Sequence, residues 1–267
     1  MCVGRSIRWH RVVRRSTGRS VIVALDHGMF LGPVEGIERV DETLKRVVSS
    51  GVDAVIVSPG VLSRFADLIA GRGVGLVLRV DHPGLIPDSL SNRLVSNAVQ
   101  ALKLGADALI ASYYVGLRDE ASNTEVVSRV VNECRDYGLV SVIEVSFIER
   151  GLSGGELLRA VKRICRAISE VGADMLKVPY TGDPRGFKEV VDSCISPVVV
   201  LGGPRRASLA EFIADVKSAV DSGAIGVAVG RNVWQRKGFE RVIEALIRVV
   251  HGGEPLSEVL SFLGVRP

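Results

Sequence analysis

The chain has 267 residues, of which 47% are hydrophobic, 24% are charged and 5% are aromatic. That composition is typical of a globular protein with a large aliphatic core, and parallel strands covered on both faces need such a filling. The net charge of +4 comes from scattered Lys and Arg residues, apart from one cluster within residues 5–15 that no aromatic-rich stripe accompanies. The charge pattern therefore indicates a solvated surface and argues against a nucleic-acid-binding protein.

Cysteine and histidine usage argues against disulfides and metal sites. The four cysteines show neither a CxxC pair nor metal-ligand spacing, and only two of the four histidines, His27 and His82, lie near predicted strand ends. No apolar run reaches the ~18 residues of a membrane span, and the arginine-rich start is not followed by a signal-peptide core. We expect a cytoplasmic protein with reduced thiols, no cofactor and no membrane segment.

Short β-branched runs alternate with amphipathic segments of helical period along the chain. Residues 1–17 predict a helix before the first run, and residues 253–267 predict a short tail that is helical over Leu256–Leu263. The predicted strands are Ser20–Leu25, Asp53–Val57, Val74–Val80, Asp107–Ser112, Val140–Val145, Asp174–Val178, Pro197–Leu201 and Ile225–Val229.

Several of the predicted helices end on a glycine that precedes the next strand by one or two residues, as at Gly51, Gly105, Gly172 and Gly223. A glycine just past a helix takes the left-handed cap. Alternating strands and helices with right-handed crossovers form a parallel sheet. Eight such units within about 250 residues favour a closed (β/α)8 barrel over an open doubly wound sheet. No composition break divides the chain, so residues 1–267 predict a single domain.

In such a barrel the chemistry lies at the carboxyl ends of the strands. Lys177 lies near the end of the sixth strand, and alternation places it inside the barrel while Leu176 and Val178 face the helices. Desolvation there favours the neutral amine that carbonyl addition requires. The alternative is a lysine that reaches solvent or pairs with an acid.

The first strand ends in Asp26 and His27, and the same alternation places Asp26 inside the barrel. Asp26 could transfer protons or form a structural ion pair with Lys177. His27 could contact substrate or be a hydrogen-bonded loop residue.

Glycine-rich turns follow the last two strands, where barrels frequently bind phosphate through exposed backbone N–H groups. They contain Gly202 and Gly203 after the seventh strand and Gly230 and Arg231 after the eighth. Tight turns also use such glycines, but Arg231 and the position of both turns favour a phosphorylated small-molecule substrate.

Four segments together resemble the archaeal-type class I fructose-bisphosphate aldolase family, which includes the 2-amino-3,7-dideoxy-D-threo-hept-6-ulosonate synthases. They are Leu25–Gly28, Lys177–Asp183, Leu201–Pro204 and Gly230–Gln235, and the likeness spans residues 18–251. The resemblance implies that Lys177 forms a Schiff base and that Asp26 is an acid/base. It also implies that the two glycine-rich turns and Arg231 hold a substrate phosphate. Family members often form rings of barrels, so it implies a homo-oligomer such as a decamer.

One departure concerns the tyrosine that the family usually carries for proton transfer at the end of the fifth strand. Alignment on Arg150 and Gly151 puts Ile148 at that position, and one inserted residue would put Phe147 there. Neither side chain can transfer a proton. We hypothesise that Glu144 replaces the tyrosine, helped by Tyr113 or Tyr114 from the fourth strand, and we expect Tyr113 to contact the substrate. The alternative is that Glu144 is a structural carboxylate.

Three functions remain open from the sequence. The first is a lyase acting on fructose 1,6-bisphosphate or a related ketose phosphate. The second is the transaldolase-type hept-6-ulosonate synthase, which uses the same lysine and supplies aromatic amino-acid synthesis. The third is a barrel that binds a phosphorylated metabolite without converting it, against which Lys177 and Asp26 argue.

Overall fold

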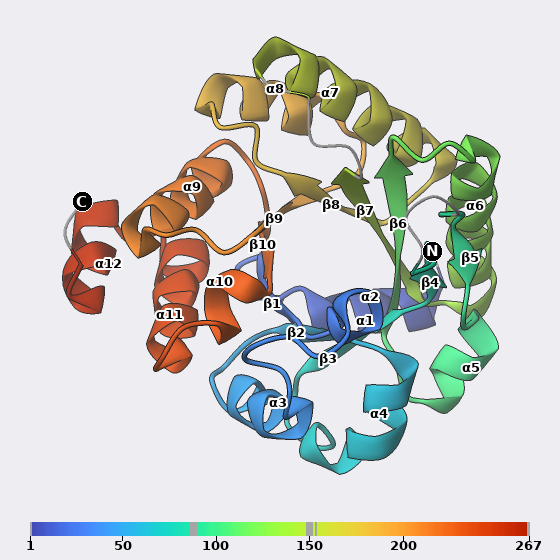
Figure 1. The fold of residues 1–267 in the computed structure, drawn as a ribbon, viewed down its shortest axis with the longest axis horizontal. Coiled ribbons are helices and arrows are strands. Elements are labelled where there is room, and N and C mark those ends of the chain that lie inside the picture. Colours follow the sequence, from blue (N-terminus) through green and yellow to red (C-terminus); the bar gives the residue numbers. More distant parts are fainter. Residues whose placement is uncertain (1, 86–89, 148–151, 153, 266–267) are drawn as a thin grey trace.

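A computed structural model describes residues 2–85, 90–147, 152 and 154–265. Eight parallel strands close into a barrel in the order β1-β10-β9-β8-β7-β6-β3-β2 (Figure 1), which confirms the predicted (β/α)8 fold. The strands are β1 (Ser20–Ala24), β2 (Ala54–Val57), β3 (Gly75–Arg79), β6 (Ala108–Val115), β7 (Val140–Phe147), β8 (Met175–Pro179), β9 (Val198–Leu201) and β10 (Gly226–Val229).

Helices surround the barrel on the outside (Figure 1). They are α3 (Val40–Val48), α4 (Pro59–Phe65), α5 (Ala98–Lys103), α6 (Glu120–Tyr137), α7 (Gly154–Val171), α8 (Pro184–Ser193), α9 (Leu209–Asp221) and α11 (Phe239–Ile247). Two short helices, α2 (Gly28–Leu31) and α10 (Arg231–Trp234), follow β1 and β10, and a two-stranded hairpin of β4 (Asp81–His82) and β5 (Arg93–Leu94) follows β3.

The terminal helices lie where the sequence predicts them. The N-terminal helix α1 (Val3–Val12) ends earlier than the predicted residue 17, because Val13 is extended and Arg14 and Arg19 form a β-bridge around a turn. The C-terminal helix α12 spans Leu256–Leu263 as predicted.

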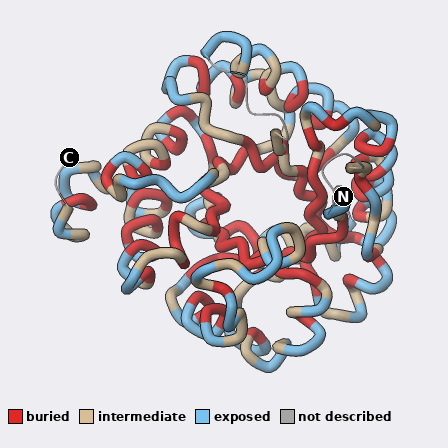
Figure 2. The backbone as a smooth tube through the Cα atoms, viewed as in Figure 1, coloured by how far each residue is buried: buried red, intermediate tan, exposed pale blue. Residues whose placement is uncertain are grey.

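Strand alternation divides the core into two layers. Side chains such as Ile22, Ile56, Val142 and Met175 fill the barrel interior in one cluster, whereas their strand neighbours pack against the surrounding helices in a larger one. Figure 2 shows the buried residues along the strands and the inward helix faces. The interior is thus packed below its carboxyl end, where polar side chains replace aliphatic ones.

The strands β6 and β7 extend three and two residues beyond their predicted ends at Ser112 and Val145. They pair in register from Ala108 opposite Val140 to Val115 opposite Phe147. Asn123 of α6 fixes the end of β6, because its side chain donates to the Tyr114 carbonyl and accepts from the Tyr114 N–H. Residues that the sequence places in loops therefore stand on rigid strands.

Three aspartates close the amino-terminal end of the barrel. Each stands immediately before a strand and accepts a backbone N–H from the neighbouring strand. Each also pairs with an arginine from the N-terminal segment. The groups are Asp53 with Val21 and Arg14, Asp107 with Leu76 and Arg11, and Asp174 with Ser141 and Arg5. Arginines of the basic cluster therefore serve the fold by docking α1 and its following turn onto the barrel.

Within the described residues, the structure contains no helix that is both long and apolar enough to span a membrane.

We predict that Asp107→Ala destabilises the fold more than Arg11→Ala. The Asp107 side chain is 5% exposed and also accepts the Leu76 N–H at 3.0 Å, whereas the Arg11 side chain is 60% exposed. Loss of the acceptor leaves a partly buried N–H without its partner and costs about 1–3 kcal/mol, while an exposed ion pair contributes less than about 1 kcal/mol. Urea unfolding followed by circular dichroism measures both. Equal costs would show that the ion pair, not the backbone contact, matters at this end.

Candidate active site

Register places three polar side chains in one row across neighbouring strands. Ser112 of β6 lies opposite Glu144 of β7, and Glu144 lies opposite Lys177 of β8. Met175, two residues before Lys177, belongs to the interior cluster, so alternation directs Lys177 into the barrel as expected. Lys177 is 5% exposed.

Lys177 and Glu144 form a close ion pair. The Lys177 Nζ lies 2.8 Å from Glu144 Oε1, and Arg79 Nη2 donates to Glu144 Oε2 at 2.5 Å. Burial alone would raise the pKa of Glu144, but the charges of Lys177 and Arg79 outweigh it and hold that pKa below its usual 4.5. Glu144 is therefore an ionised carboxylate, and one of its oxygens lies within hydrogen-bond distance of the Lys177 ammonium.

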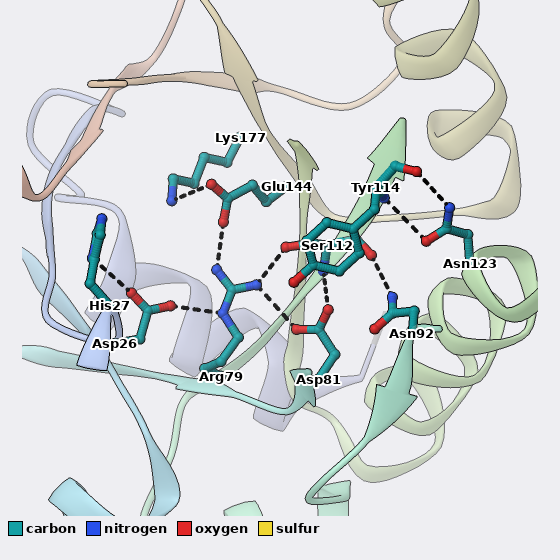
Figure 3. A network of polar contacts seen from close by, with 10 residues as sticks. All are labelled: Asp26, His27, Arg79, Asp81, Asn92, Ser112, Tyr114, Asn123, Glu144 and Lys177. Carbon is teal, nitrogen blue, oxygen red and sulfur yellow. Dashed lines mark hydrogen bonds and ion pairs between the residues drawn. The ribbon is translucent and has the colours of Figure 1, made fainter. Parts of the chain in front are cut away.

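Arg79 is the centre of the buried network in Figure 3. Its Nε donates to Asp26 at 2.7 Å, and its Nη1 donates to Asp81 at 3.1 Å and to Ser112 at 2.9 Å. Neither Arg79 nor Asp81 was among the residues predicted for the site. The available signal was a charged residue in the otherwise apolar run of β3, at the same carboxyl end as the other candidates.

Asp26 faces the interior as expected, but it is turned towards protein groups. Its Oδ2 accepts from Arg79, and its Oδ1 lies 3.4 Å from His27 Nδ1. Burial would raise the pKa of Asp26, but Arg79, His27 and Lys177 together hold it well below its usual 3.8. Asp26 is not among the described residues that line the neighbouring cavity, whereas His27 is.

A cavity of about 500 Å³ opens at the carboxyl end of the barrel, within the range of small-molecule sites. It brings together the ion pair, the first-strand histidine and both glycine-rich turns. Its lining includes Ala24, His27, Glu144, Ser146, Phe147, Lys177, Gly202, Gly203, Gly230 and Arg231.

Close packing at the cavity wall explains two of these glycines. A Cβ on Gly230 would lie 2.5 Å from His27 Cε1, and one on Gly202 would lie 2.9 Å from Val229 Cγ1. The His27 ring in turn meets Trp234 edge-on, with ring centroids 5.3 Å apart. Gly230 thus lets the His27 ring lie against the turn that begins α10.

Tyr113 does not lie where the sequence interpretation placed it. Alternation along β6 turns Ser112 and Tyr114 inward and Tyr113 outward, so the Tyr113 hydroxyl donates to Glu120 at 2.5 Å and lines a separate cavity between α6 and α7. The expected contact of Tyr113 with substrate beside Lys177 is therefore corrected. The Tyr114 ring lies beside Ser112 (Figure 3). Burial raises its pKa above the usual value, so its phenol stays protonated.

The position of the expected fifth-strand tyrosine is only partly described. Phe147 ends β7 and lines the cavity, while Ile148 and the Arg150–Gly151 pair lie outside the described residues. Among the residues that the structure describes, no group of three or more His, Cys, Asp or Glu side chains is arranged to hold a metal ion.

Known aldolases resemble this chain in sequence and in fold. The model of the DeoC/LacD family aldolases matches residues 20–236. A 2-amino-3,7-dideoxy-D-threo-hept-6-ulosonate synthase of Archaeoglobus fulgidus is 36% identical over 98% of this chain and 96% of its own length. A class 1 fructose-bisphosphate aldolase of Thermoproteus tenax is 31% identical over 91% of this chain and 94% of its own.

A solved archaeal fructose 1,6-bisphosphate aldolase superposes with a TM-score of 0.80 at 28% identity, covering 93% of this chain and 100% of that one. A second solved structure, of a Schiff-base-forming fructose-1,6-bisphosphate aldolase, gives 0.80 at 29% identity, with 92% and 99% covered. The predicted resemblance is confirmed: the chain belongs to the DeoC/LacD aldolase family and is an enzyme of its class I, Schiff-base-forming type.

Proposed function

We propose that this enzyme breaks or forms a C–C bond in a phosphorylated ketose, with fructose 1,6-bisphosphate as the first candidate, through a Schiff base on Lys177. The observation that carries the proposal is the buried ion pair at the cavity, in which Lys177 Nζ lies 2.8 Å from Glu144 Oε1. An amine adds to a carbonyl only as the free base, and Glu144 is the adjacent acceptor for its proton. That pairing supports catalysis over a barrel that only binds a metabolite.

Glu144 alone can carry each proton that the proposed Schiff-base reaction transfers. Glu144 takes a proton from the Lys177 ammonium, and the free amine adds to the ketone. Glu144 then gives its proton to the former ketone oxygen and takes one from the added nitrogen, which yields the neutral carbinolamine. Protonated Glu144 finally passes this second proton to the carbinolamine hydroxyl, which leaves as water while the iminium forms. The iminium then accepts the electron pair of the breaking C–C bond as Glu144 removes the proton of the neighbouring hydroxyl. Protonation of the enamine and hydrolysis release the second product and restore Lys177.

The two glycine-rich turns favour a phosphate-binding site in the same cavity. Gly202 and Gly203 after β9, and Gly230 and Arg231 after β10, line the cavity that contains Lys177. Turns in this position of a barrel offer backbone N–H groups to phosphate, and Arg231 supplies positive charge. His27 borders the same space, which supports a contact of this residue with the sugar chain.

The second candidate is transaldolase-type hept-6-ulosonate synthase activity, which the 36% identity to the Archaeoglobus fulgidus enzyme favours. The two reactions share the lysine and the enamine and differ in its fate, since a lyase protonates the enamine and a transferase passes it to a second carbonyl compound. Product release that requires an added aldehyde or ketone acceptor would select the transferase.

Assembly into a ring of barrels stays a prediction.

We predict that borohydride added together with fructose 1,6-bisphosphate or dihydroxyacetone phosphate reduces an imine on Lys177 and inactivates the enzyme. Peptide mass mapping locates the adduct. Lys177→Met abolishes labelling and turnover, whereas Lys188→Met, which removes an exposed lysine of α8, changes neither. Absence of an adduct with every ketose phosphate tested would overturn the proposal.

We predict that Glu144→Gln lowers kcat by roughly 10²- to 10⁴-fold, the range for loss of a general acid/base, while Lys177 remains in place. Because the pKa of Glu144 lies below 4.5, its carboxylate persists through neutral pH, and its protonation limits the wild-type enzyme only in more acidic solution. Glu120→Gln is the matched control, since Glu120 pairs with Tyr113 outside this cavity. Steady-state kinetics decides the question, and unchanged turnover of Glu144→Gln would rule out the assigned role.

A further inference from the structure

The position of Arg79 on the barrel gives it access to both carboxylates beside Lys177. In the closed strand order, β3 is separated from β1 by β2 and from β7 by β6. Arg79 lies at the last position of β3, opposite Ile110 and therefore two residues below the row that Ser112 begins. From that depth its side chain extends between Asp26 and Asp81 towards Glu144 (Figure 3).

Arg79 does not itself face the substrate space. Its side chain is 3% exposed, and it is absent from the described residues that line the cavity. Its guanidinium is engaged by protein acceptors at Nε, Nη1 and Nη2. Its effect on the reaction must therefore act through the groups it holds.

The three carboxylates around Arg79 favour a cation that keeps its proton. Three carboxylates, Asp26, Asp81 and Glu144, surround the guanidinium, and only Glu144 is also paired with Lys177. A guanidinium stays protonated at every pH at which a protein is folded, so Arg79 does not act as a proton donor. It binds one oxygen of Glu144 and leaves the other free to exchange a proton with Lys177. A second lysine at this place would be a competing proton donor.

On the basis of the proposed function, we propose that Arg79 is a positioning residue that fixes Glu144 and Asp26 as ionised carboxylates at set places beside Lys177. Asp81 anchors the arginine, since its Oδ1 accepts from Arg79 while its Oδ2 accepts the Ser112 N–H at 2.8 Å. Asp81 thereby ties the guanidinium to the same β6 backbone that begins the row.

Other groups face Arg79 and bear on any pH dependence. They are His27 behind Asp26, Ser112 and Tyr114 on β6, Lys177 behind Glu144, and the Phe30 ring of α2, which lies 5.4 Å from the guanidinium carbon and stacks on His82. Burial by itself would raise the pKa of both Asp26 and Glu144, and the charge of Arg79 is among the largest effects that lower each of them. Removal of the guanidinium therefore raises both pKa values.

The test compares Arg79→Met, Arg79→Lys and the control Arg14→Met, which removes an arginine from a 2.8 Å pair with Asp53 at the opposite end of the barrel. We expect Arg79→Met to lower kcat by roughly 10²-fold or more, as for misplaced catalytic groups, with KM changed much less. The acid limb of its pH profile moves to higher pH. Arg79→Lys keeps the charge but cannot bridge both carboxylates, so it loses turnover while its acid limb stays near that of the wild type.

Arg14→Met is expected to lower stability without changing kcat or the acid limb. Wild-type turnover and an unshifted acid limb in folded Arg79→Met would overturn the proposal, as would a loss that merely follows the unfolded fraction. If Arg79→Met does not fold, Arg79→Lys decides, because full turnover in that variant excludes a bridging role.

A readout without substrate separates this proposal from the proposed function. Carbon-13 titration of the Glu144 carboxyl, assigned by its disappearance in Glu144→Gln, should shift to higher pH in Arg79→Met even if no ketose phosphate ever forms an imine. An unchanged Glu144 titration would refute the role of Arg79, whereas a shifted titration with no imine in the wild type would refute only the proposed reaction.

Discussion

The candidate site depends on the ion pair between Lys177 and Glu144, which stand on neighbouring strands. Lys177 can act as a nucleophile only when its ammonium has a nearby acceptor, and parallel register places Glu144 directly opposite it. No loop movement is needed to form this pair, because both residues stand inside paired strands. The position of the two groups is therefore set by the same backbone hydrogen bonds that close the barrel.

The two ends of the barrel use buried carboxylates in different ways. At the amino-terminal end, three carboxylates accept backbone N–H groups and bind arginines of the N-terminal segment, and they therefore stabilise the fold. They belong to Asp53, Asp107 and Asp174. At the carboxyl end, Asp26 and Glu144 share one guanidinium, and Glu144 keeps one oxygen for Lys177. Stability and chemistry are thus separated along the strand axis, as is usual in barrels of this type.

Strand periodicity in the sequence was sufficient to predict the barrel and the inward direction of Lys177 and Asp26. Periodicity could not predict the length of β6 and β7, because their last residues are held by tertiary contacts such as those of Asn123 with Tyr114. The assignment of Tyr113 failed for this reason. If the predicted strand had continued past Ser112, as β6 does, alternation would have placed Tyr114 inside and Tyr113 outside. Arg79 was missed because a charged residue in a short apolar strand has many possible partners, and only the closed strand order shows that Asp26 and Glu144 flank it.

The proposed Schiff base on Lys177 is tested most directly by a crystal structure of the enzyme after borohydride reduction in the presence of dihydroxyacetone phosphate. We expect continuous density from Lys177 Nζ to the former carbonyl carbon. A Glu144 oxygen should lie within hydrogen-bond distance of the reacting atoms, and the phosphate should lie between the turns after β9 and β10. Arg79 should still contact Asp26 and Glu144 beneath the adduct. An adduct on another lysine, or a Glu144 carboxylate turned away from the bound ketose, would contradict it.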